Sequence, residues 1–240
     1  MKRSLIMLLL AALSMVAVTG SADELVLTEQ LKKVLPQNAD ISDVQPTAVP
    51  GVYEVTVGSR TFYAHSNGEF LLVGEMFDLN RNVNLADERR GDRMQDALAA
   101  IPESRMIVMG PENPKRVMTV FTDVDCAYCR KLHRDVPALN EAGLQVRYLM
   151  FPRAGLGSKS YQTSVSVWCS EDRVDAITRA KLGQAIEPKT CENPVAEHYK
   201  LGQDIGISGT PTLVMDDGRI VPGYLPPQAL LAEVGISPSE

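Results

Sequence analysis

The sequence is poor in cysteine, has no excess of positive charge and holds only one long apolar run. Its 240 residues include 4 Cys, too few for a small disulfide scaffold but enough for one or two bridges or one metal site. Lys and Arg number 24 against 30 Asp and Glu, which gives a net charge of -6. Nucleic-acid binding draws on clustered positive side chains, so this balance argues against nucleic acid as a partner.

The one long apolar run lies at the start of the chain and predicts export. A basic start, residues 1–3, precedes an apolar run over residues 5–18. This run is shorter than the roughly 20 residues that span a bilayer core. The small residues Gly20 and Ala22 fit a signal-peptidase site, so residues 1–22 are predicted to be a cleaved signal peptide rather than an uncleaved anchor. The mature chain is then expected to be exported, into a compartment where disulfides persist.

Residues 23–83 are predicted to form a small α+β domain. A short helix is expected over residues 28–35, with Thr28 as its cap. Alternating apolar residues and turn signals predict three strands, over residues 52–57, 60–66 and 70–74. A unit of this size has a thin core, and an exposed edge strand in it is a natural pairing surface.

The charged segment that follows, residues 84–104, is predicted to be a partly exposed linker helix. Leu85, Met94 and Leu98 recur at near-helical spacing, and Gly91 is expected to soften the helix. The alternative is an ordinary surface helix of a single domain.

Residues 105–240 are predicted to form a second, α/β domain. The predicted strands cover residues 117–122, 146–151, 212–215 and 219–221, and the predicted helices cover about 126–133, 159–184, 195–205 and 227–234. The order β-α-β, helices, β-β-α is that of a thioredoxin fold with a helical insertion.

The chemistry is expected at Cys126 and Cys129, a Cys-x-x-Cys pair between a strand and a helix. At a helix N-terminus, unsatisfied N–H groups and the helix dipole stabilise a thiolate and lower the thiol pKa. Cys126 is therefore the predicted nucleophile, and Cys129, one turn later, the thiol that resolves the mixed disulfide.

Three other uses of this pair are disfavoured. Zinc binding wants a second closely spaced Cys or His pair, which the isolated Cys169 and Cys191 do not supply, so no metal and no cofactor is expected. Haem attachment wants His directly after the second Cys, where this chain has Arg130. A purely structural bridge is disfavoured because a disulfide that closes a strained two-residue loop stabilises a fold poorly.

Cys169 and Cys191 are the remaining pair. Four Cys allow three connectivities, and a local pair at 126 and 129 leaves a bridge between 169 and 191. We predict a structural disulfide here, with a second redox centre as the alternative.

Thr210-Pro211 lies just before a predicted strand. Statistics alone favour a trans peptide bond at this proline. A cis bond would expose the neighbouring backbone beside the thiols, where an extended substrate segment could pair with it.

Taken together, these motifs resemble the periplasmic protein disulfide isomerases of the DsbC family. The stretches that carry the resemblance are Val120-Phe121-Thr122-Asp123, Cys126-Ala127-Tyr128-Cys129, Lys131-Leu132-His133, Val146-Arg147-Tyr148-Leu149, Phe151-Pro152-Arg153, Trp168-Cys169, Gly209-Thr210-Pro211 and Val221-Pro222-Gly223-Tyr224. Sister DsbG-type proteins are also similar, but they usually have Pro inside the motif and lack the second Cys pair.

The resemblance implies a homodimer held by a cystatin-like N-terminal dimerisation domain, and a thioredoxin-fold catalytic domain with a cis Pro211. It implies that Tyr128, Thr210 and Pro211 contact misoxidised exported proteins, and that a membrane thiol donor of the DsbD type keeps Cys126 and Cys129 reduced. A dithiol oxidase and a thiol-independent chaperone are the alternative functions.

Three positions near the motif carry expectations of their own. Ala127 and Asp125 depart from the family pattern, and the Asp125 carboxylate is expected to raise the pKa of Cys126 by like charge. The alternative is that Asp125 only caps the helix and points into water, where its effect on the pKa is small. His133, one turn past Cys129, is expected to be a solvated helix residue rather than one that tunes the thiols.

Overall fold

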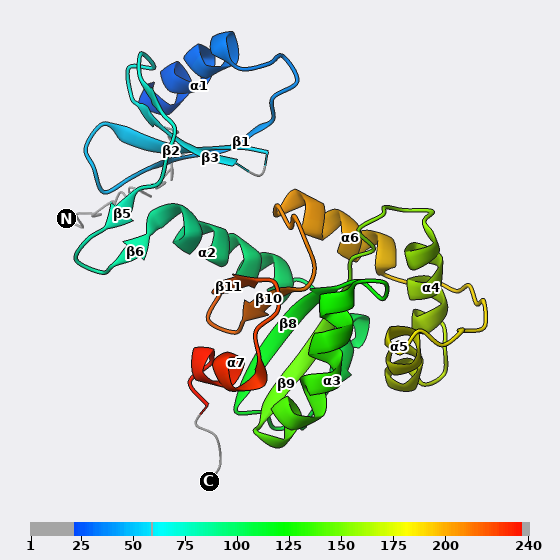
Figure 1. Ribbon diagram of the computed structural model, residues 1–240. Helices are drawn as coiled ribbons and strands as arrows, with labels where there is room; N and C mark the ends of the chain where they lie inside the picture. Colours follow the sequence, from blue (N-terminus) through cyan, green and yellow to red (C-terminus); the bar gives the residue numbers. More distant parts are fainter. Residues whose placement is uncertain (1–21, 59, 237–240) are drawn as a thin grey trace, which may run out of the picture. The chain divides into compact units, whose positions relative to one another are not determined.

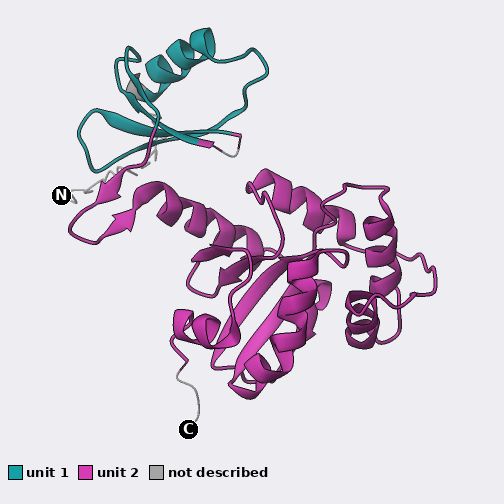
Figure 2. Ribbon diagram, in the orientation of Figure 1, with its two compact units in different colours: residues 1–57, 61–73 teal, residues 58–60, 74–240 magenta. Residues whose placement is uncertain are grey.

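The computed structural model describes residues 22–58 and 60–236, which divide into two compact units (Figure 2). The first unit comprises residues up to 57 together with 61–73, and the second takes the rest of the chain. The predicted signal peptide lies outside the described residues, apart from Ala22, where the first helix begins. No helix within the described ranges is long and apolar enough to cross a bilayer.

The first unit is one helix against a four-stranded sheet in the order β1-β2-β3-β4. Its elements are α1 (Ala22–Val34), β1 (Ile41–Pro46), β2 (Val52–Val57), β3 (Arg60–His65) and β4 (Leu71–Leu72). The predicted start of the helix at Thr28 is wrong. Buried Leu27 and Leu31 share one face of α1, which carries the helix back past Thr28, and the Thr28 hydroxyl donates to the Glu24 carbonyl one turn earlier.

The second unit is built on a five-stranded sheet in the order β11-β10-β8-β9-β7 (Figure 1). Only β8 and β9 run parallel, and the other neighbours are antiparallel. The unit begins with a short hairpin of β5 (Phe77–Asp78) and β6 (Val83–Asn84), followed by the long helix α2 (Leu85–Ala99). The elements that follow are η1 (Glu103–Arg105), β7 (Ile107–Met109), β8 (Arg116–Thr122), α3 (Ala127–Glu141), β9 (Leu144–Met150), α4 (Lys159–Trp168), α5 (Arg173–Lys181), α6 (Val195–Asp204), β10 (Thr212–Met215), β11 (Ile220–Pro222) and α7 (Pro227–Glu233). The predicted thioredoxin fold with a helical insertion is confirmed.

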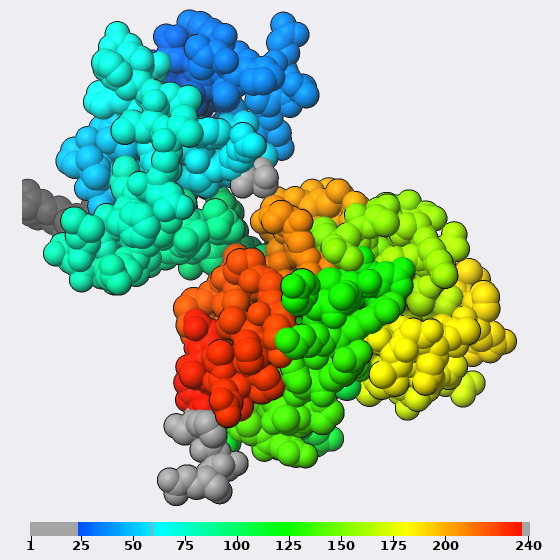
Figure 3. Space-filling view, in the orientation of Figure 1, coloured from blue at the N-terminus to red at the C-terminus, as the bar shows by residue number. Residues whose placement is uncertain are grey.

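Alternation along the central strands divides the interior of this unit into two faces. Val120 and Tyr148 point to a core completed by α3, α4, α5 and α7, whereas Phe121 and Leu149 point to a core completed by α2 and α6. In the space-filling view, the orange-red atoms of the C-terminal hairpin and α7 flank the green atoms of α3, and the yellow atoms of the insertion flank them on the other side (Figure 3). Helix α3 thus contacts α7 on one side and α5 on the other.

The long helix predicted over residues 159–184 is wrong, because it is two helices. The first ends at Trp168, and Asp172 caps the second by accepting a hydrogen bond of 2.9 Å from the Asp175 amide. A capping Asp competes with continued helix and so marks a new start. The break turns α5 back beside α3 and brings its last residue, Lys181, into the core.

Gly91 permits a close approach rather than softening its helix. A Cβ added there would lie 2.8 Å from the carbonyl oxygen of Gly218, in the turn between β10 and β11. Beside this contact, the Gln95 amide donates to the Asp216 carbonyl at 3.0 Å. The helix α2 is therefore packed directly on the strand turn.

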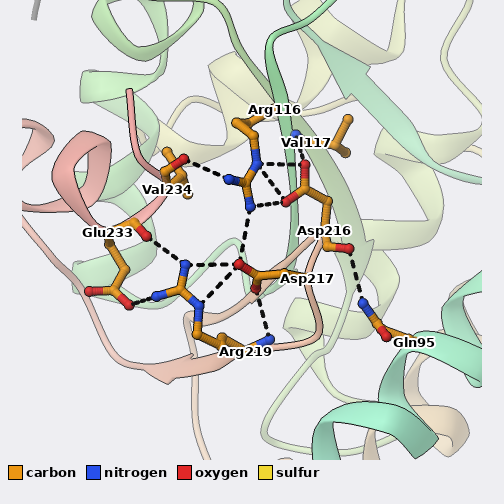
Figure 4. Close-up of polar contacts among 8 residues, drawn as sticks. All are labelled: Gln95, Arg116, Val117, Asp216, Asp217, Arg219, Glu233 and Val234. Atoms are coloured by element: carbon orange, nitrogen blue, oxygen red, sulfur yellow. Dashed lines mark hydrogen bonds and ion pairs between the residues drawn. The ribbon is translucent and has the colours of Figure 1, made fainter. Parts of the chain in front are cut away.

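The same turn is fixed by a network of charged side chains (Figure 4). Arg116 on β8 pairs with Asp216 and Asp217 and donates to the Val234 carbonyl at 2.9 Å. Arg219 joins Asp217 and Glu233, so the network ties β8, the β10–β11 turn and the end of α7 together. Bidentate Arg–carboxylate geometry makes such contacts more specific than single surface pairs.

The predicted bridge between Cys169 and Cys191 is present, with the Cα atoms 5.7 Å apart. It ties the end of α4 to the extended segment before α6. Replacing both residues by Ala should lower the free energy of unfolding by about 2–5 kcal/mol, the usual effect of losing a native bridge. Urea unfolding of the oxidised double variant beside the wild type measures this. A loss of less than about 0.5 kcal/mol would contradict a stabilising role.

Candidate functional site

The two remaining cysteines sit where the central strand β8 gives way to α3. Cys126 is the N-cap of α3, with extended backbone, and Cys129 lies in its first turn. Both are free thiols and both are buried, at 3% and 0% exposure. The N-cap position puts the Cys126 sulfur beside the unpaired N–H groups of the helix.

The segment before β10 closes over Cys126. The Cys126 thiol donates to the Thr210 carbonyl oxygen at 3.1 Å, and the Thr210–Pro211 peptide is cis, as the family resemblance implies. Pro211 is buried, while Tyr128 on the first turn of α3 is 63% exposed. The structure thus brings Thr210 against Cys126 and leaves a tyrosine ring open to solvent on the same turn.

The surroundings of Cys126 favour its ionised form. Burial alone would raise the pKa of this thiol, but the neighbouring Thr210 side chain and Cys129 outweigh burial, with help from the positive charge of Arg153. The pKa of Cys126 is therefore lowered from its ordinary value. A thiolate is the reactive form in disulfide exchange, so this environment suits an attacking thiol.

Asp125 does not face the nucleophile. Its carboxylate pairs with Arg130 at 3.3 Å and its side chain is 53% exposed. Its charge does not figure among the main influences on the pKa of Cys126. Its position next to Cys126 in the sequence predicts that the Asp125 charge opposes ionisation of the Cys126 thiol. In the structure the Asp125 side chain instead faces solvent and Arg130.

A buried carboxylate, Asp123, organises the loop beside the thiols. It accepts hydrogen bonds from the Ser160 hydroxyl, the Asp125 amide at 2.9 Å and the Arg153 amide and guanidinium at 3.0 and 3.2 Å. Burial would raise the pKa of Asp123, but these donors lower it. The carboxylate stays ionised and anchors Arg153 near Cys126.

Cys129 has the opposite environment. Burial raises the pKa of this thiol, and the nearby Lys181 charge and the Thr122 hydroxyl only partly oppose the effect. The Lys181 ammonium is itself buried and donates to the Thr122 hydroxyl at 2.7 Å. The environment of Cys126 thus favours the thiolate, whereas that of Cys129 favours the protonated thiol.

His133 is buried, so its expected place in solvent is wrong. Its two ring nitrogens contact the Tyr148 and Thr178 hydroxyls, each at 3.0 Å. Burial and the Lys181 charge lower the pKa of His133 to about 4, so the ring is neutral near pH 7. The break between α4 and α5 brings Thr178 to the ring, and the helical pattern of residues 159–184 concealed this contact.

The sequence predicted both cysteines and the proline loop but missed the groups around them. Asp123 and Arg153 lie within motifs that carried the resemblance, yet nothing in their spacing assigned them a role. Lys181 gave no signal at all, because a lysine near the end of an amphipathic helix is normally solvated.

Comparisons with known proteins agree with this geometry. Residues 103–235 match the thioredoxin-like domain family, and residues 18–87 match the disulfide bond isomerase protein N-terminal domain. Among solved structures, the chain is similar to the disulfide interchange protein from Neisseria gonorrhoeae, with a TM-score of 0.51 and 32% identity over 56% of this chain and 96% of that one.

Curated relatives extend the similarity along the whole chain. Over 97% of its length it is 35% identical to the thiol:disulfide interchange protein DsbC of Dickeya dadantii, of which 94% is covered. With DsbC of Escherichia coli K12, identity is 36% over 92% of this chain and 90% of that protein. The chain therefore belongs to the DsbC family of thiol:disulfide interchange proteins, and its activity is that of a protein disulfide isomerase.

Proposed function

We propose that this protein rearranges wrong disulfides in exported proteins, with Cys126 as nucleophile and Cys129 as resolving thiol. The observation that carries the proposal is the opposed environment of the two thiols: the pKa of Cys126 is lowered and that of Cys129 is raised. Refolding of a scrambled multi-disulfide protein tests it, with the wild type beside Cys126→Ser.

The reaction begins with attack of the Cys126 thiolate on one sulfur of a substrate disulfide. The substrate S–S bond breaks, a bond from Cys126 to the substrate forms, and the other substrate sulfur leaves as a thiolate. That thiolate attacks elsewhere in the substrate, and a later attack on the mixed disulfide regenerates Cys126 without net oxidation. When rearrangement stalls, the Cys129 sulfur attacks Cys126, the bond from Cys126 to the substrate breaks and the substrate leaves as a thiolate. A bridge between residues 126 and 129 is left behind.

The substrate segment is proposed to bind between Tyr128 and the proline loop. Tyr128 offers an exposed ring beside the nucleophile, and the Thr210 carbonyl already lies 3.1 Å from the Cys126 sulfur. An extended chain alongside Thr210 and Pro211 would present its disulfide to Cys126, with backbone contacts that suit many sequences.

A homodimer is proposed to form through the N-terminal domain, residues 23–83. The last strand of its sheet, β4, is very short and sits in an apolar exposed stretch: Phe70 is 63% exposed, Leu71 43%, Leu72 51% and Val73 78%. An exposed apolar edge of this kind invites pairing with another chain. Residues 84–104 are proposed as the linker helix and residues 105–240 as the catalytic domain, two of which enclose a substrate.

The proposed compartment is the periplasm, reached through the signal peptide at residues 1–22. The bridge between Cys169 and Cys191 supports an oxidising compartment, since such bridges persist there. A membrane thiol donor of the DsbD type is the proposed source of electrons that keeps Cys126 and Cys129 reduced. A dithiol oxidase remains the second candidate, and an oxidised site in cells would favour it.

Cys126→Ser should abolish rearrangement of scrambled substrate, because no thiolate is left to attack. Cys129→Ser should instead accumulate covalent complexes with substrate, because the resolving thiol is missing. Non-reducing gels and mass spectrometry of trapped complexes distinguish the two variants. If alkylation mapping finds Cys129 to be the faster-reacting thiol, the roles are reversed.

Arg153→Gln should raise the pKa of Cys126 by up to about one pH unit, because a nearby cation favours the thiolate and Arg153 is partly screened by solvent. Below that pKa, the variant should then react more slowly with iodoacetamide. Asp125→Asn is the matched control, and its thiolate absorbance titration should follow the wild type. If the pKa of Cys126 changes more in Asp125→Asn than in Arg153→Gln, then Asp125 and not Arg153 is the charge that controls this pKa.

A variant with Leu71→Lys and Val73→Lys should be monomeric, because charges on a sheet edge oppose pairing. Val174→Lys, which changes an exposed apolar residue of α5, should keep the oligomeric state of the wild type. Sedimentation velocity measures both. A dimeric edge variant would exclude this strand as the contact.

A further inference from the structure

Behind Cys129 lies a fully buried amine. Lys181, the last residue of α5, is 2% exposed, and within the described ranges it is the one lysine with such complete burial. Its Nζ lies 5.3 Å from the centre of the Tyr148 ring and donates to a hydroxyl group. Burying an ammonium group costs free energy unless a nearby group compensates, so a buried lysine at this position suggests a specific role.

The contacts of Lys181 lead directly to the resolving thiol. Its Nζ donates to Thr122 Oγ1 at 2.7 Å, and the Thr122 hydroxyl lies near enough to the Cys129 thiol to lower the pKa of that thiol. Thr122 is 0% exposed, so this path from nitrogen to sulfur is shielded from water. Hydroxyl groups both accept and donate, which lets one proton enter such a path as another leaves.

We propose that Lys181 and Thr122 form a proton relay that takes the proton of Cys129 when this thiol resolves the mixed disulfide. The inference rests on the proposed roles of Cys126 and Cys129. Thr122 lies beside the reacting sulfur, and Lys181, which contacts Thr122 rather than the sulfur, accepts the proton through it.

The step balances as follows. Cys129 S–H gives its proton to Thr122 Oγ1, and Thr122 gives its own proton to the neutral amine of Lys181. The Cys129 sulfur then attacks Cys126, the bond from Cys126 to the substrate breaks, and the substrate leaves as a thiolate. Two electrons pass from the cysteine pair to the substrate sulfur. The proton on Lys181 is later returned to solvent or to the leaving thiolate.

The other groups around Lys181 are less suited to accept this proton. The charged and titratable groups that face it are Asp123 at the end of β8, Cys126, Cys129, Arg130 and His133 on α3 and its cap, and Tyr148 on β9. Asp123 is held ionised by its donors, and the pKa of His133 is about 4. Neither group takes up a proton readily near pH 7.

Lys181 can hold or release a proton near neutral pH. Burial lowers its pKa to about 8, against the opposing negative charges of Cys129, Asp123 and Cys126. In the mixed disulfide, Cys126 carries no charge, so one influence that raises the pKa of Lys181 is gone. The neutral amine is then more abundant at the step that needs it.

Reaction of the reduced full chain with one equivalent of dithiobis(nitrobenzoate) separates the two thiols. The first release of coloured nitrothiobenzoate reports attack by Cys126, and the second reports resolution by Cys129. In Lys181→Met, the second phase should slow about tenfold near pH 7 and its pH midpoint should rise by about one unit, since loss of a neighbouring cation raises a thiol pKa. Thr122→Val should act in the same direction, and the double variant should be no slower than the slower single one.

Three controls separate the relay from a structural effect. Lys200→Met removes a positive charge that is 74% exposed, and both phases should match the wild type. The first phase should change far less than the second in either relay variant. The urea midpoint of Lys181→Met should not fall, because an apolar side chain of similar size is tolerated at a buried ammonium site.

Second-phase rates and pH midpoints that equal the wild type in both relay variants would overturn the relay. If the wild type releases only one equivalent, or if Cys126→Ser keeps the first phase, the roles proposed for the cysteines fail instead. The two failures are therefore distinguishable.

Discussion

The proposed chemistry of this protein depends on a thiolate at the N-terminus of α3, in an interior where burial favours the neutral thiol. Burial favours the neutral thiol at both Cys126 and Cys129. At Cys126 the Thr210 side chain, Cys129 at the start of the helix and the Arg153 charge outweigh burial. At Cys129 the Lys181 charge and the neighbouring polar groups do not outweigh it. The difference between two thiols three residues apart is thus a matter of which donors reach each sulfur.

The sheet supplies those donors in the required places. The strand β8 delivers Thr122 and Asp123 at its end, and β10, its antiparallel neighbour, delivers the Thr210–Pro211 loop beside Cys126. The register is fixed by buried side chains on both faces, since a slip of one residue would exchange the two cores. The network around Arg116 and Asp216 holds the other end of the same strand pair. Packing far from the thiols therefore sets the geometry at the thiols.

The helical insertion is part of the site as well as a covering layer. It places Thr178 on His133 and Lys181 on Thr122, so α5 forms the inner wall of the region behind Cys129. The bridge between Cys169 and Cys191 ties the end of α4 to the segment before α6. The bridge thus closes the segment of chain that contains α5 and its residues Thr178 and Lys181.

The sequence by itself determined the Cys-x-x-Cys pair at a helix start, the β-α-β and β-β-α segments of the thioredoxin fold, and the partnership of Cys169 with Cys191. The motif and the strand and helix segments depend on residues that are close together in the chain. The disulfide pairing follows from there being only four cysteines. Only the tertiary structure decided that Asp125 turns to Arg130, that His133 is buried, and that Lys181 reaches Thr122, 59 residues away in sequence. The pKa of a buried group depends on neighbours brought together by folding, and no local pattern encodes them.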